Sequence, residues 1–294
     1  MFSREVLRQI RQLQLRVRRA VEDPLGGAYR SVFKGSGITF EEVREYQPGD
    51  EIRSIDWNVT ARMGRPFIKR YIEERELTVM LLVDVSASMG FTSTDNVKRD
   101  ALAELAALLT LCAVSSNDKI GLALTTGKVE HFVPPRKGSR HALRLIRDLF
   151  VWKPTDPTTN LAAGLDFVNK VLHHRALIFL CSDFLDSDYE RTMKRIARKH
   201  DVIAVTIDDP REQALPGVGL LELFDPETRR TVTVNTSDPV FKTAHAALVQ
   251  SRRQAFQQWT QAHGIDVLSV NTEGKHLDAL MRFFRQRQRR LRHL

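Results

Sequence analysis

The chain has 294 residues, of which 42% are hydrophobic, and it carries a formal net charge of +9. This length and composition suit a globular protein with a sizeable core, either one large domain or a domain with an appended module. No run of about 18 uncharged apolar residues occurs, which argues against a chain built around transmembrane helices.

The two cysteines, Cys112 and Cys181, both lie inside apolar segments. This position favours buried, reduced thiols over a disulfide framework. Residues 1–21 lack the continuous apolar core that is typical of a signal peptide. We therefore expect a cytoplasmic protein.

The positive charge is concentrated at the two ends of the chain. Residues 1–20 carry +5 and residues 275–294 carry +6, so the central 254 residues sum to −2. Such ends suit solvated helix faces, and peripheral membrane association stays open. Nucleic-acid binding through the basic termini is the weaker alternative, because no aromatic interleaving or nucleic-acid motif accompanies the charge. The sequence carries no signal for the oligomeric state.

The first segment, residues 1–25, is predicted to be an amphipathic helix that packs on the body of the protein. Its apolar residues recur at intervals of three and four, at Val6, Ile10, Leu13, Val17 and Val21.

Residues 26–76 are predicted to form a small β-rich module. Turn signals at residues 35–37 and 48–50 separate segments of alternating polarity, and we expect strands at residues 38–46, 52–57 and 66–72. The segment has nearly balanced charges and two aromatic residues, which favours structural ion pairs around an aromatic anchor; a charged ligand site is the alternative. The residues concerned are Arg44, Tyr46, Asp50, Arg53, Asp56, Trp57 and Arg62.

Strands and helices alternate through residues 77–274, which we expect to form the main domain, and a basic helix at residues 275–294 follows. This alternation predicts an α/β fold with a doubly wound, mostly parallel sheet of the Rossmann type. We expect strands at residues 77–83, 119–125, 129–133, 176–181, 202–207, 219–224, 231–234 and 265–270. We expect helices at residues 98–115, 140–150, 161–172, 189–199 and 240–262.

An acid and two hydroxyls follow the first of these apolar strands, in the order Asp84, Ser86 and Ser88. Ligands of open α/β sheets bind outside the carboxyl ends of the strands, so these side chains lie where such a fold places its chemistry. Oxygen ligands of this kind suit Mg²⁺, Mn²⁺ or Ca²⁺ and not zinc. Capping of the following helix by the hydroxyls is the structural alternative.

Two further polar segments are predicted to reach the same edge of the sheet. Thr159 lies in the loop of residues 155–160, with Thr158 as the alternative if the alignment of this loop shifts by one position. Asp183 follows the fully apolar strand at residues 176–181, and Asp156 is a spare carboxylate in the loop.

These residues resemble the metal-ion-dependent adhesion site of von Willebrand factor A domains. That site combines an Asp-x-Ser-x-Ser strand end, a threonine in a later loop and an aspartate after a later strand. The resemblance implies a metal site made of Asp84, Ser86, Ser88, Thr159 and Asp183, holding Mg²⁺, or Mn²⁺ or Ca²⁺ in its place. It also implies an open metal position that attracts a carboxylate from a protein partner.

The run of residues 44–76 resembles the region before this strand in the bacterial family called domain of unknown function 58. The two resemblances together cover roughly residues 35–270. Members of that family often accompany MoxR-type AAA+ ATPases, which implies an adaptor or chaperone-like assembly factor that works with such an ATPase.

The residues favour binding over catalysis, so we expect that the protein is not an enzyme. The main alternative is a phosphohydrolase that uses Asp84 as its nucleophile. That chemistry needs a second aspartate two residues on as the acid/base group, and position 86 is a serine. The histidines at positions 131, 141, 173 and 174 are predicted to lie away from these loops.

Overall fold

The computed structural model describes residues 25–33, 39–72, 76–90, 97–272, 274 and 276–291. The helix predicted for residues 1–25 lies almost entirely outside these ranges. Two compact units can be distinguished. Phe33–Leu77 forms the smaller one, and Thr78–Leu294 belongs to the larger one, which also contains most of helix α2 (Gly26–Phe33).

The smaller unit contains a two-stranded antiparallel sheet. Strand β1 (Thr39–Glu45) pairs with β2 (Phe67–Ile72), as predicted for two of the three strands in this segment. The third predicted strand, at residues 52–57, is wrong. A 3-10 turn, η2 (Ile52–Ser54), and helix α3 (Trp57–Met63) stand there instead.

Asp56 explains why a helix forms at this point. Its carboxylate accepts hydrogen bonds from the backbone amides of Asn58 and Val59, so it caps the first turn of α3. Gly64 ends the helix in the left-handed region, at φ 66°. The local capping interactions therefore outweigh the alternation of polar and apolar residues that predicted a strand.

The predicted ion pairing of the smaller unit is confirmed at Arg44 and Asp50. The guanidinium donates two hydrogen bonds to the Asp50 carboxylate, at 2.7 and 2.9 Å, and these bonds lower the pKa of Asp50. Trp57, by contrast, is 67% exposed, so the expected role of this residue as an aromatic anchor is wrong.

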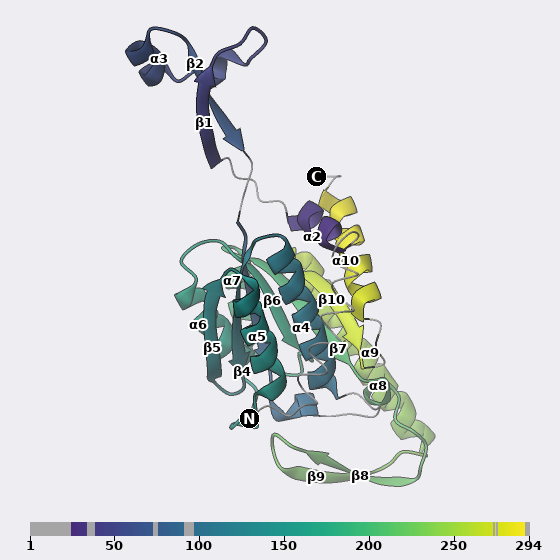
Figure 1. The fold of residues 1–294 in the computed structure, drawn as a ribbon. Helices are drawn as coiled ribbons and strands as arrows, with labels where there is room; N and C mark the ends of the chain where they lie inside the picture. The colour runs from purple at the N-terminus through teal and green to yellow at the C-terminus, as the bar shows by residue number, and fades with distance from the viewer. Residues whose placement is uncertain are drawn as a thin grey trace. The chain divides into compact units, whose positions relative to one another are not determined.

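The larger unit is built around a six-stranded sheet with the order β10-β7-β6-β3-β4-β5 (Figure 1). Five strands are parallel, and β5 runs antiparallel to β4 at one edge. The expected α/β, doubly wound and mostly parallel sheet is thus confirmed. The strands are β3 (Thr78–Asp84), β4 (Lys119–Thr125), β5 (Val129–Arg136), β6 (Leu177–Ser182), β7 (Asp201–Asp208) and β10 (Asp266–Asn271).

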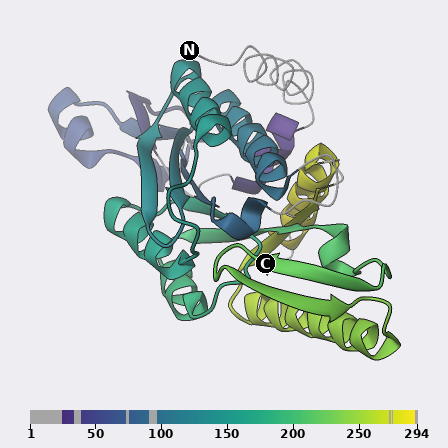
Figure 2. The ribbon, with the colours of Figure 1, turned by 90° about the horizontal axis from the view of Figure 1, so that it is seen from below.

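Helices cover both faces of this sheet (Figure 2). The apolar side chains of α6 and α7 pack with Met80 and Leu82 on one face, where Phe256 and Trp259 of α9 join them. Helices α4, α5 and α10 cover the other face. The bounds are α4 (Lys98–Ser115), α5 (Ser139–Val151), α6 (Leu161–Val171), α7 (Tyr189–Ala197), α8 (Pro210–Gln213), α9 (Pro239–Ala262) and α10 (His276–Leu291).

The basic C-terminal helix docks on the body of the larger unit. Leu280 and Phe284 of α10 are fully buried. The Phe284 ring meets the ring of Tyr29 in α2 edge to face, with 5.9 Å between the centroids. Residues 26–33, which the sequence assigned to the β-rich module, therefore form a helix that packs on α10.

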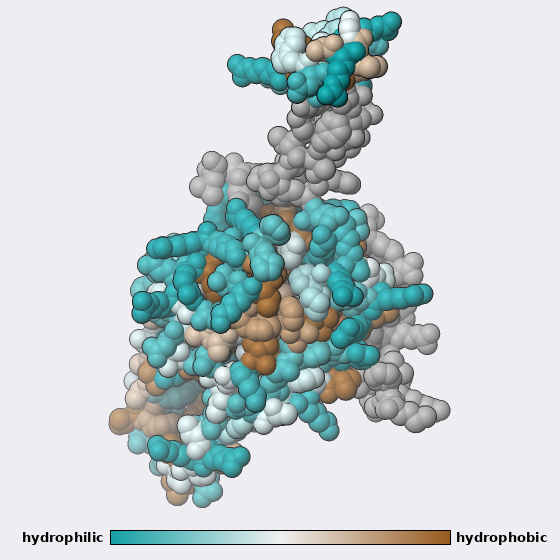
Figure 3. Space-filling view, turned by 90° about the vertical axis from the view of Figure 1, so that its left-hand side faces the viewer, coloured by the Kyte–Doolittle hydropathy of each residue, from teal (hydrophilic) through white to brown (hydrophobic). Residues whose placement is uncertain are grey.

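A hairpin of β8 (Leu220–Asp225) and β9 (Arg230–Asn235) forms a separate two-stranded sheet before α9. It extends below the main sheet in the view of Figure 1 and lies beside α9 in the view of Figure 2. Leu220 and Phe224 of this hairpin are strongly exposed. Small apolar patches also lie among hydrophilic side chains on the face shown in Figure 3.

Two other expectations concern single features. Cys112 and Cys181 are buried and free, as predicted. Within the described ranges, no helix combines the length and the apolar character that crossing a membrane requires.

Replacing Phe284 tests the docking of α10. The Phe284→Ala substitution removes a fully buried ring, and we expect the free energy of unfolding to fall by about 3–5 kcal/mol. The urea midpoint measures this change. Phe224→Ala is the matched control, because that ring is 63% exposed and its loss should shift the free energy by about 0.5 kcal/mol or less. Equal effects of the two substitutions would contradict the docking.

Candidate metal centre

Asp84 is the last residue of the central strand β3 and is fully buried. Its Oδ1 accepts a hydrogen bond from the Ser86 amide at 2.9 Å, and its Oδ2 accepts one from the Ser182 hydroxyl at 2.7 Å. Strand β6, which ends at Ser182, pairs with β3 in parallel. The neighbouring strand end therefore holds the orientation of the Asp84 carboxylate.

The charge on Asp84 is costly in this position. Burial raises the pKa of Asp84 to about 6, and the nearby charge of Asp183 adds to the shift, whereas the hydrogen bonds from Ser86 and Ser182 act against it. A cation beside the two carboxylates would offset both the burial and the repulsion.

The two serine hydroxyls lie next to each other. Ser86 Oγ and Ser88 Oγ are 3.1 Å apart. Ser86 directly precedes the short 3-10 turn η3 (Ala87–Gly90), and Ser88 lies within it. Neighbouring ligands of an octahedral Mg²⁺ lie about 2.8–3.0 Å apart, since each metal–oxygen bond is about 2.0–2.1 Å long. The spacing of this pair therefore suits adjacent positions around such an ion.

The loop that carries Thr159 is joined to the Asp84 loop through the backbone. The Ala87 amide donates to the Pro157 carbonyl at 3.0 Å, and the Asn160 amide donates to the Thr126 carbonyl beyond strand β4. Glu130 holds the start of the loop, because its carboxylate accepts bonds from the Thr155 and Asp156 amides. These and other bonds lower the pKa of Glu130 to about 2 although its partial burial acts in the opposite direction.

Thr159 and its alternative as a ligand, Thr158, differ in their hydrogen-bond partners. Thr158 is exposed and donates its hydroxyl to Asp156 at 2.7 Å, so these two side chains satisfy each other within the loop. Thr159 instead donates its hydroxyl to the carboxylate of Glu227, at 2.8 Å. Glu227 lies in the turn between β8 and β9.

Asp183 is paired with a buried lysine. Lys98, at the start of α4, is fully buried, and its ammonium nitrogen lies 3.2 Å from Asp183 Oδ2 and 2.5 Å from Glu212 Oε1 in α8. Burial acts to lower the pKa of Lys98, but the charges of Asp183 and Glu212 outweigh it, so this pKa is raised. Lys98 therefore stays charged and takes up part of the negative charge at this edge of the sheet.

The donor set fits a hard divalent cation. Five oxygen-bearing side chains lie at the carboxyl ends of neighbouring parallel strands or in the loops joined to them, and the residues are Asp84, Ser86, Ser88, Thr159 and Asp183. Among the described residues, no group of three or more His, Cys, Asp or Glu side chains could hold a metal ion. A site here would therefore depend on hydroxyl groups as well as carboxylates, and the ligand set stays a prediction.

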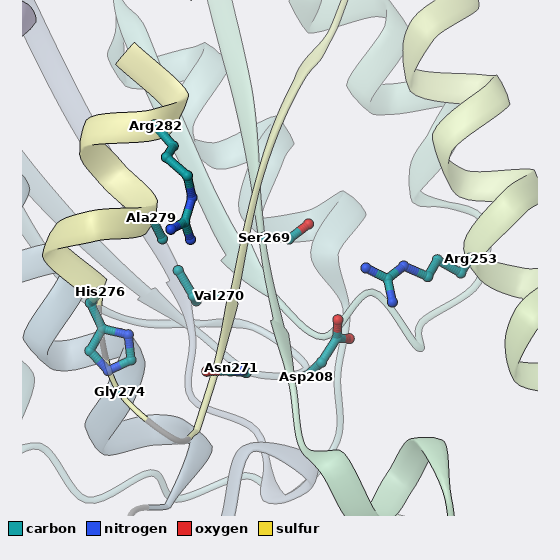
Figure 4. Close-up of a pocket in the computed structure, with 9 residues that line it drawn as sticks. All are labelled: Asp208, Arg253, Ser269, Val270, Asn271, Gly274, His276, Ala279 and Arg282. Atoms are coloured by element: carbon teal, nitrogen blue, oxygen red, sulfur yellow. The ribbon is translucent and has the colours of Figure 1, made fainter. Parts of the chain in front are cut away.

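A cavity of about 320 Å³ lies near the ends of β7 and β10. Arg253 of α9 points toward Asp208 on one side of β10, and His276 and Arg282 of α10 lie on the other side (Figure 4). Its lining is mostly polar, whereas small-molecule sites are mostly apolar with few polar groups. The loops around Asp84 remain the stronger candidate.

Sequence reasoning did not assign a role to three residues that contact the candidate ligands, which are Lys98, Ser182 and Glu227. It also missed Glu212, which pairs with Lys98. Ser182 could have been found, because it stands directly before Asp183 at a strand end. Lys98 is the first residue of α4, Glu212 lies in α8, and Glu227 lies in a hairpin turn. No local sequence pattern distinguishes these three residues from other charged residues on helices and turns.

Relatives of the chain are found among bacterial proteins. An uncharacterized protein of Mycobacterium tuberculosis, Rv1480, is 31% identical over 95% of this chain and 89% of its own length. A protein of Paracoccus denitrificans, named as an uncharacterized protein in the moxR 3′ region, is 34% identical over 33% of this chain and 92% of its own length.

Two solved structures are similar at low identity. BatB from Bacteroides thetaiotaomicron is 12% identical, with a TM-score of 0.49, over 72% of this chain and 99% of its own. The SpRpn10 VWA domain is also 12% identical, with a TM-score of 0.41, over 72% and 95% of the two chains. Residues 42–255 match the family described as protein of unknown function DUF58. The match covers more than half of the chain, so the chain belongs to the DUF58 family.

Proposed function

We propose that this protein is a metal-dependent protein-binding module. The observation that carries the proposal is the arrangement around Asp84: a buried carboxylate fixed by Ser86 and Ser182, with two adjacent hydroxyls 3.1 Å apart. Asp84, Ser86, Ser88, Thr159 and Asp183 would hold Mg²⁺, or Mn²⁺ or Ca²⁺. The bound ion would supply a positive charge that attracts a carboxylate from a partner.

The chemistry of the ligand set supports an ion that keeps part of its charge. Serine and threonine hydroxyls are neutral, so they fill metal positions without cancelling the charge of the ion. Lys98 already neutralises part of Asp183. An ion held mainly by Asp84 and hydroxyls would therefore favour one more anionic ligand.

We also propose that the protein is not a hydrolase. Phosphohydrolase chemistry at Asp84 needs a second aspartate two residues on as the acid/base group, and Ser86 stands there. Several histidines are engaged elsewhere: His131 bonds Asp148, His141 bonds the Ile120 carbonyl, and His200 accepts from the Ala176 amide.

The proposed partner is a MoxR-type AAA+ ATPase, with this protein as an adaptor or chaperone-like assembly factor. The support is the Paracoccus denitrificans relative, whose name locates it in the moxR 3′ region. An acidic side chain on the ATPase, or on a client that the two proteins share, would complete the metal site.

Replacing Asp84 tests the metal site. Saturating Mg²⁺ should raise the free energy of unfolding of the wild type by about 2.7 kcal/mol at a hundredfold excess over Kd. Asp84→Asn keeps the shape of the side chain and should abolish this gain, as measured by urea denaturation with and without Mg²⁺. Asp156→Asn is the matched control and should keep the gain, because Asp156 bonds Thr158 within its own loop. An unchanged response in the Asp84 variant would refute the ligand set.

Capture of the ATPase tests the function. Immobilised protein should retain a MoxR-type ATPase of the same organism in Mg²⁺ and lose it in excess chelator, with affinity falling by at least about tenfold, since a charge-assisted contact is lost. Quantitative pull-down over a range of ATPase concentrations measures the change. Equal retention in the two buffers would show that the contact does not depend on a metal.

A further inference from the structure

The turn of the β8–β9 hairpin sends one acidic side chain toward the candidate metal centre. Of the turn residues 226–229, Glu227 alone is partly buried, and the other three are exposed. Its Oε1 accepts the hydrogen bond from the Thr159 hydroxyl at 2.8 Å. Glu227 is thus 68 residues from Thr159 in the sequence. It belongs to the two-stranded β8–β9 sheet, which is separate from the six-stranded sheet whose edge carries the candidate metal centre.

The turn is built to hold this side chain in place. Asp225 accepts hydrogen bonds from the amides of Glu227 and Thr228 and from the Thr228 hydroxyl, and these bonds lower the pKa of Asp225. Proline at position 226 restricts the backbone further, and Arg229 takes the left-handed conformation, at φ 57°. The other polar side chains of the turn thus shape the turn itself, whereas the Glu227 carboxylate reaches out of it.

The spacing of the two oxygens also suits a shared ion. Adjacent ligands of an octahedral Mg²⁺ lie about 2.8–3.0 Å apart, and the Thr159 and Glu227 oxygens are 2.8 Å apart. A carboxylate of the chain itself therefore stands beside a predicted metal ligand, at the separation that a carboxylate ligand from a partner would have.

We propose that Glu227 is an internal carboxylate ligand of this site and that the hairpin turn is a tethered competitor of the acidic partner. This inference rests on the proposed metal-dependent function. The tether gives Glu227 a high effective concentration at the site, so a partner must displace the turn before its own carboxylate can bind. The chemical class of the partner ligand is then an acidic side chain in an exposed turn, like the one it displaces.

Hydrogen exchange of the hairpin amides tests the internal ligand. In the wild type, Mg²⁺ should slow exchange across residues 220–235 compared with chelator, because the ion fixes the turn. Glu227→Gln should lose this slowing. Glu222→Gln removes the same charge from an exposed position on the same hairpin and should behave like the wild type. If Mg²⁺ slows hydrogen exchange of the hairpin amides equally in the Glu227→Gln and Glu222→Gln variants, the proposal is overturned.

A peptide tests the competition. A cyclised, fluorescein-labelled peptide of residues 221–234 can be closed between its ends, since Leu221 and Val234 are paired in the hairpin. In Mg²⁺ it should bind the Glu227→Gln protein at least about tenfold more tightly than the wild type or the Glu222→Gln protein, as measured by fluorescence polarisation. Equal affinity for all three proteins would overturn the tethered competitor.

The metal response separates the two failures. If Mg²⁺ stabilises the wild type but not the Asp84→Asn variant, the proposed function stands, and the Glu227 experiments then decide the inference alone. If Mg²⁺ leaves the wild type unchanged in both stability and hairpin exchange, the metal site is refuted, and the inference falls with it.

Discussion

The arrangement of this edge of the sheet depends on one buried charge, the carboxylate of Asp84. Strand β3 lies between β4 and β6 and is buried on both faces, so its last residue cannot turn to solvent without breaking the sheet. A carboxylate in such a place must be compensated by hydrogen bonds, by a cation or by a proton. Ser86 and Ser182 supply the hydrogen bonds, and the raised pKa shows that these do not compensate fully.

In the proposed site, the compensation would be divided between a fixed cation and an exchangeable metal ion. Lys98 is the fixed one: it is fully buried and pairs with Asp183 and Glu212, so its charge cannot leave the site. Lys98 forms ion pairs with Asp183 and Glu212. The polar side chains that follow Asp84 in the chain, Ser86 and Ser88, carry hydroxyl groups. This separation is the physical reason to expect a metal ion near Ser86 and Ser88 and not beside α8.

Most of the larger unit could be predicted from the sequence, because its signals are local. The apolar runs of β3, β6 and α4 identify these elements within one or two residues. The prediction failed where capping decided the structure, at the carboxylate of Asp56, which starts α3 inside a segment of strand-like alternation. Helix α2 was missed because Gly26 and Gly27 look like a helix end, whereas the burial of Leu25 and Tyr29 stabilises a helix there.

For a related reason, local signals in the sequence place only the strand-end residues of the candidate site, and Thr159 was assigned from the resemblance. Asp84 and Asp183 follow apolar runs, so the sheet order alone brings them to one edge. Nothing local in the sequence links Lys98 with Glu212 or Thr159 with Glu227, since these pairs form through the packing of α8 and the course of the hairpin. Long-range pairs of this kind require the tertiary structure.

The hairpin gives the proposed site a means of regulation that follows from linkage. If a partner's carboxylate and Glu227 compete for one position, any contact that favours the displaced hairpin raises the affinity for the partner. The partner then raises the affinity for that contact by the same factor. The exposed side chains of Leu220 and Phe224 both lie on β8, the strand that leads into the Glu227 turn. A protein that binds these apolar side chains more tightly when the hairpin is displaced would therefore shift the position of Glu227 without touching the metal.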